Sequence, residues 1–150
     1  MTLLDERFIQ EAIAGLGSRE RASDAWWNEA EVFVADGNYD FAMRRYNQAW
    51  LLNPNSFKPY WGFARVLLEN KQVEPSIAQF DRALSLVNDK YQEPALLTDA
   101  ANANVALARS RSDPAERRAI FLKADSMYPG GHPNSPSDGH FKIPQQSLSR

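Results

Sequence analysis

The chain has 150 residues, of which 43% are hydrophobic and 24% are charged, a composition that is ordinary for one soluble globular domain. Its 17 basic and 19 acidic side chains give a net charge of -2, so no overall positive field draws it to nucleic acid or to an anionic membrane. A run of about 18 apolar residues is absent, which argues against membrane insertion, and the lack of cysteine excludes disulfides, thiolate ligands and thiol nucleophiles.

The first residues, MTLLDERFIQE, carry acids where an export signal has basic residues followed by an apolar run. As written, the chain is therefore expected to be cytoplasmic. Export or association with the cell envelope is the alternative if a leader has been removed, and the absence of cysteine is compatible with any compartment.

Apolar residues recur at helical spacing from residue 3 to about residue 128, and no segment shows the sustained alternation that predicts strands. The chain is therefore expected to be all α-helical. The predicted helices cover residues 3–14, 24–36, 40–52, 57–70, 75–87, 91–110 and 114–127.

Residues that favour helix ends support these limits. Gly15 and Gly17 are expected to close the first helix, because glycine readily adopts the left-handed conformation found after helix C-termini. Ser23 and Ser56 stand where N-caps are needed. The sequence Asp-Pro-Ala-Glu at 113–116 combines a capping acid, a proline at the first helical position and a glutamate that can reach back.

An aromatic residue followed three positions later by alanine recurs on the second helix of each predicted pair. The aromatic positions are Tyr46, Phe80 and Phe121, so the intervals are 34 and 41 residues. Helix pairs with a 34-residue period resemble the tetratricopeptide repeat family. The segment 23–56 carries the family's aromatic, small and turn residues at Trp26, Ala30, Phe33, Gly37, Tyr39, Ala42, Tyr46, Ala49 and Pro54.

The later units depart from the family pattern. In 57–90, Ser76 replaces an alanine and Asn88 stands where proline is expected, and in 98–131 Arg117 occupies a position that is usually small. The extra residues near 91–97 are expected to lengthen the next helix.

The resemblance implies a right-handed α-α superhelix of about seven helices. Its expected parts are a capping helix at 1–17, three repeats within 23–131 and a flexible tail rich in Pro, Gly and Ser at 132–150.

In this family the first helices of the repeats line a concave groove that binds a peptide or a protein segment. The candidate groove residues are Trp27, Glu31, Lys58, Trp61, Arg65, Leu68, Asn102 and Arg109. Trp27 and Trp61 are 34 residues apart, so they are expected to lie side by side as a rigid anchor. The alternative is that both pack sideways against neighbouring helices. The family's carboxylate clamp has Lys and Asn where this chain has Trp27 and Glu31, which argues against a clamp of that kind.

A rival prediction is self-association, because no further helix follows the last repeat to cover its apolar face. The candidate residues are Ile120, Phe121, Leu122 and Met127, with Phe141 and Ile143 of the tail as a segment that could dock there. The expected partner is a protein, a peptide or a second copy of the chain.

Catalysis, cofactors and metal ions have no supporting motif. The two histidines, His132 and His140, lie in the tail, where a linker is the simpler interpretation. Acidic residues close in sequence, such as Glu29 and Glu31, are expected to form a solvated helix face. A non-catalytic interaction module is therefore the favoured function.

Overall fold

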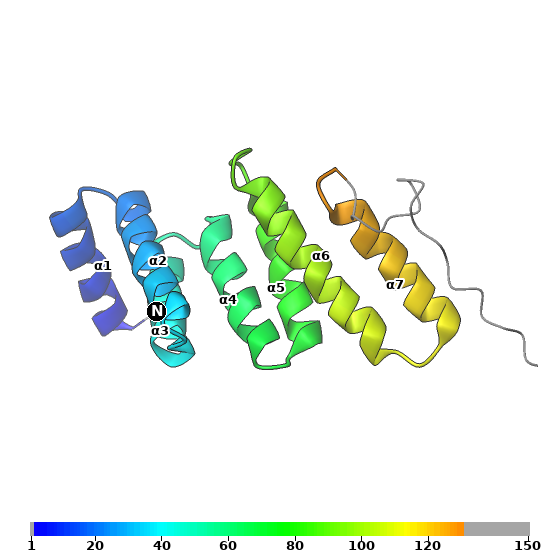
Figure 1. The fold of residues 1–150 in the computed structure, drawn as a ribbon. Helices are drawn as coiled ribbons and strands as arrows, with labels where there is room; N and C mark the ends of the chain where they lie inside the picture. The colour runs from blue at the N-terminus through cyan, green and yellow to red at the C-terminus, as the bar shows by residue number, and fades with distance from the viewer. Residues whose placement is uncertain (1, 131–150) are drawn as a thin grey trace, which may run out of the picture.

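The computed structural model describes residues 2–130, which form seven α-helices and no strand (Figure 1). The helices are α1 (Leu3–Leu16), α2 (Arg19–Ala35), α3 (Tyr39–Leu52), α4 (Phe57–Glu69), α5 (Val73–Leu86), α6 (Glu93–Ser110) and α7 (Pro114–Met127). The all-helical prediction is confirmed for this part of the chain. The expectations about His132, His140, Phe141 and Ile143 concern positions outside the described residues.

Most predicted helix ends agree with the structure, because the expected caps form. Ser56 accepts a hydrogen bond from the Lys58 amide, and the Asp113 side chain accepts from the Ala115 amide. Gly17 ends α1 with a left-handed φ of 90°, whereas Gly15 remains inside that helix. The expected lengthening at residues 91–97 appears as α6, the longest of these helices at 18 residues, with a proline in its first turn.

The predicted start of α2 is wrong. Ser18, not Ser23, caps this helix, and its side chain accepts from the Arg21 amide. Ser23 is buried inside the helix, where its hydroxyl donates to the carbonyl of Ala49 on α3 at 2.8 Å. The early turns of α2 are rich in charged residues, so apolar periodicity gave no signal for them.

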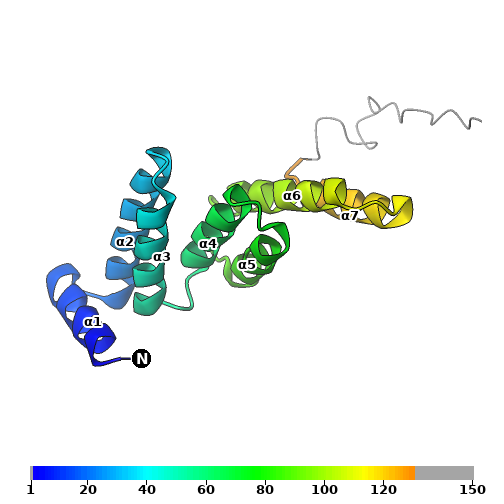
Figure 2. The same cartoon turned by 90° about the horizontal axis from the view of Figure 1, so that it is seen from below.

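The helices pack on their neighbours in chain order. α2 packs on α3, α4 on α5 and α6 on α7, and each pair also contacts the next pair through α3 with α4 and α5 with α6. The first helices α2, α4 and α6 touch one another in turn, and α1 packs on α2 and α3. The result is an elongated molecule with α1 at one end and α7 at the other (Figures 1 and 2).

The turns within the first two helix pairs have the same backbone geometry 34 residues apart. Gly37 and Lys71 both have left-handed φ angles, 74° and 64°. The Gly37 amide donates to the Val34 carbonyl, as the Lys71 amide donates to Leu68. The turn between α6 and α7 differs, since Arg111 is extended and Asp113 caps the next helix. The described residues thus contain two closely similar units and a third with another turn.

Small residues allow the helices to approach closely, and aromatic residues fill the space between pairs. A Cβ atom added at Gly62 on α4 would lie 2.4 Å from the ring of Tyr46 on α3, so only glycine fits there. Phe8, Ile9 and Ile13 of α1 join the cluster around Leu52. In the described part of the chain, α7 contributes only Ala124 to the buried core.

Candidate functional site

The predicted groove residues on α2 and α4 contact one another across the two helices. The rings of Trp27 and Trp61 lie 6.3 Å apart, so the two tryptophans stand side by side as the spacing predicts. Lys58 forms an ion pair with Asp24 at 3.0 Å, and Arg65 forms one with Glu31. All three pairs join residues 34 positions apart.

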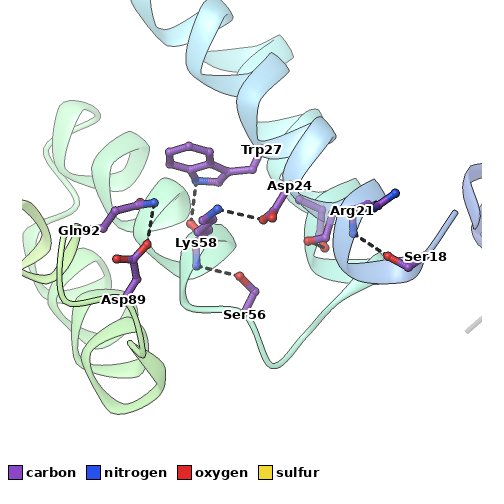
Figure 3. A network of polar contacts seen from close by, with 10 residues as sticks. Ser18, Arg21, Asp24, Trp27, Ser56, Lys58, Asp89 and Gln92 are labelled. Carbon is purple, nitrogen blue, oxygen red and sulfur yellow. Dashed lines mark hydrogen bonds and ion pairs between the residues drawn. The ribbon is translucent and has the colours of Figure 1, made fainter. Parts of the chain in front are cut away.

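Both indole N–H groups reach forward to the next first helix. Trp27 Nε1 donates to the backbone carbonyl of Lys58 at 3.1 Å (Figure 3), and Trp61 Nε1 donates to Asp99 Oδ2 at 2.7 Å. The acceptors differ, since the first is a backbone carbonyl of α4 and the second is a side-chain carboxylate of α6. Each tryptophan therefore joins its own repeat unit to the following one.

Burial of Trp61 corrects part of the expected anchor. This indole is only 6% exposed, stacks on Phe57 and belongs to the largest core cluster. Trp27 is half-buried and packs against the same cluster, while the ammonium of Lys58 lies over its ring at 5.3 Å. The alternative prediction, sideways packing against neighbouring helices, describes both residues better than an open anchor does.

A polar cluster of Glu31, Tyr46 and Arg65 links α2, α3 and α4. The Tyr46 hydroxyl donates to Glu31 and accepts from Arg65 at 3.0 Å, and the guanidinium of Arg65 also lies over the Trp61 ring. Burial, with the hydrogen bond to Glu31 as the next cause, raises the pKa of the Tyr46 phenol above its ordinary value. Glu31 and Arg65 are thus engaged within the molecule.

The predicted groove residues open to solvent lie on α6. Asn102 and Arg109 are exposed there, although Asn102 also accepts a hydrogen bond from the Tyr128 hydroxyl. Leu68 is half-buried against the main core cluster. Of the predicted groove residues, those that are exposed therefore lie on α6 alone.

The apolar residues of α7 form a second open surface. Phe121 is 37% exposed and Leu122 is 54% exposed, whereas Ile120 is half-buried and Met127 packs against the main core cluster. The equivalent aromatic residues of the earlier units, Tyr46 and Phe80, are completely buried. Phe121 is therefore the most exposed of the three equivalent aromatic residues.

Spacing alone missed three residues that build this interface, namely Asp24, Asp99 and the hydroxyl of Tyr46. A signal for the first was available, because Asp24 and Lys58 have opposite charge at the 34-residue offset. Asp99 follows Lys58 by 41 residues, so the insertion hides its correspondence.

Within residues 2–130, no group of three or more His, Cys, Asp or Glu side chains is placed to hold a metal ion. None of the described helices combines the length and apolar character needed to cross a membrane. No protein-family model matches the chain, and no curated protein is significantly similar to it.

Proposed function

We propose that this chain is a tetratricopeptide-like repeat protein that works as a non-catalytic protein-interaction module. The observation that carries the proposal is the recurrence of whole contacts, not only of residue types, at the family's 34-residue period. Turn hydrogen bonds, left-handed turn residues and cross-helix ion pairs all repeat or connect at this offset. A bundle of unrelated helices has no reason to repeat its turns in this way.

In this proposal the repeats are 23–56, 57–90 and 98–131, preceded by the capping helix at 1–17. Successive pairs stack into a right-handed superhelix, with α2, α4 and α6 on the concave side. Trp27 and Trp61 form a wall of the groove instead of its anchor, because their N–H groups are already bonded.

The partner is a peptide or protein segment that meets the groove beside α6. Arg109 is exposed there and can bind a carboxylate of the partner with two parallel hydrogen bonds. Asn102 and the half-buried Ala106 lie on the same helix and supply a polar and an apolar contact. An acidic segment is therefore the favoured ligand.

The test is affinity capture with the wild-type chain and two charge-reversal variants. Arg109→Glu changes the proposed groove, and Arg44→Glu, on the exposed surface of α3, is the matched control. A protein retained by the wild type and the control but lost from Arg109→Glu supports the groove. Equal retention by all three proteins contradicts it. Alanine variants of the tryptophans are unsuitable because they open the core.

A second candidate function is a structural subunit that self-associates through its last repeat. The exposure of Phe121, compared with the complete burial of Tyr46 and Phe80, favours this candidate. Light scattering over a concentration series tests it, and a constant monomer mass contradicts it.

A further inference from the structure

The first two helix pairs show what kind of surface covers the aromatic residue equivalent to Phe121. They therefore indicate what would fit on the exposed face of α7. Tyr46 of the first unit is covered by α4, where Gly62 and Phe63 meet its ring. Phe80 of the second unit lies in the cluster that Leu96 and Ala100 of α6 complete. In each case the cover is one helix, packed across the pair, with small residues among its contacts. Phe121 has the equivalent position and lacks such a helix among the described residues.

The other end of the molecule offers a helix of matching length and opposite charge. α1 and α7 each have 14 residues. Three acidic residues and one arginine lie on α1, whereas α7 carries three basic and two acidic residues. α1 also exposes Leu3 and Leu4, at 84% and 79%.

We propose that α1 of a second copy of this chain covers the α7 face, in a head-to-tail contact. The inference rests on the second function proposed above and names its partner and its geometry. Exposed leucines of α1 pack against Phe121 and Leu122, and the acids of α1 face Arg117, Arg118 and Lys123 of α7. Such a contact uses two different surfaces, so it generates rings or open chains instead of symmetric dimers.

Sedimentation velocity with the full chain tests the proposal through three matched substitutions of exposed apolar residues. Leu4→Glu changes the α1 surface, Leu122→Glu changes the α7 surface, and Val32→Glu, at a residue 61% exposed on α2, is the control. Because all three side chains are already exposed, circular dichroism should show unchanged helix content. The average mass of the wild type and of the control is expected to increase with protein concentration. Each of the other two variants, measured alone, is expected to remain monomeric.

Mixing the two interface variants provides the decisive measurement. The Leu4→Glu chain keeps its α7 surface and the Leu122→Glu chain keeps its α1 surface, so an equimolar mixture should form a 1:1 complex and nothing larger. This outcome is specific to a head-to-tail contact.

Two results overturn the inference and can be told apart. If the wild type self-associates and Leu4→Glu does so equally, then α7 meets another surface and only the head-to-tail geometry fails. If the wild type stays monomeric at every concentration, self-association itself fails, which includes the case where residues after Gly130 cover α7 within one chain. Neither result affects the groove tested with Arg109→Glu.

Discussion

At the scale of single residues, the contact between Gly62 and Tyr46 decides how closely α4 approaches α3. Tyr46 is completely buried, and its ring leaves no space for a side chain at residue 62. The sequence placed Tyr46 at one of the aromatic positions of the tetratricopeptide pattern. The sequence did not predict that the Tyr46 hydroxyl would also form hydrogen bonds with Glu31 and Arg65. Residue spacing predicts which face of a helix a side chain lies on, but not its polar partners.

Replacing Gly62 with alanine should destabilise the fold by about 2–3 kcal/mol, because a new Cβ atom would overlap the Tyr46 ring. Gly15→Ala is the matched control, since no atom lies within 4 Å of its added Cβ atom, and it should stabilise α1 by about 0.5–1 kcal/mol. Urea unfolding followed by circular dichroism measures both. Equal effects of the two substitutions would refute the steric argument.

The raised pKa of Tyr46 predicts a loss of stability in alkaline solution. Its unfolded value is about 10.0 and its folded value is higher, so its contribution is complete below pH 10 and is lost as the pH rises further. The loss is about 1.4 kcal/mol per pH unit until the folded phenol itself ionises. The difference in unfolding free energy between the wild type and Tyr46→Phe should therefore shrink above pH 10. A difference that stays constant from pH 8 to pH 11 would show that Tyr46 is not the cause.

At the scale of helices and turns, most of the fold was predictable because helical periodicity and capping residues agree. The start of α2 was the exception, since Ser18 and the charged turn after it carry little apolar signal. The second turn was also hidden. Gly37 predicts a backbone position with a left-handed φ angle. Its counterpart 34 residues later is Lys71, and lysine does not favour that conformation, so the sequence did not predict it.

Because Lys71 holds a conformation that L-residues adopt at a cost, Lys71→Gly should stabilise the protein by up to about 1 kcal/mol. Gly37→Ala, at the equivalent turn, should destabilise it by a similar amount. Chemical denaturation of both variants beside the wild type provides the measurement. If Lys71→Gly lowers the unfolding free energy, glycine's greater unfolded-state entropy outweighs the relief of strain.

At the scale of the whole molecule, each helix pair contacts mainly its neighbours, so stability should vary along the chain. The sequence predicted that neighbouring helices pack on one another in chain order. It did not predict that polar side chains of α2 and α4 would bond to one another. Ion pairs and indole hydrogen bonds depend on side-chain rotamers, which no periodic pattern specifies.

Native-state hydrogen exchange should show the least protection in the terminal helices α1 and α7, because each has a single buried residue among those described, Ile9 and Ala124. Protection should be greatest in α4, whose buried residues contribute to two core clusters. Measurement at low protein concentration keeps self-association from masking α7. Uniform protection across all seven described helices would instead indicate that the molecule unfolds as a single cooperative unit.

The neighbouring indoles of Trp27 and Trp61 also give the molecule an intrinsic optical reporter. Their rings are 6.3 Å apart and tilted by 38°, a geometry in which the electronic transitions of two chromophores couple. Near-ultraviolet circular dichroism should therefore contain a signal that belongs to the docking of α2 against α4 and to neither helix alone. Separation of these two helices would erase that signal while far-ultraviolet helicity remained, so opening between units could be followed without any attached label.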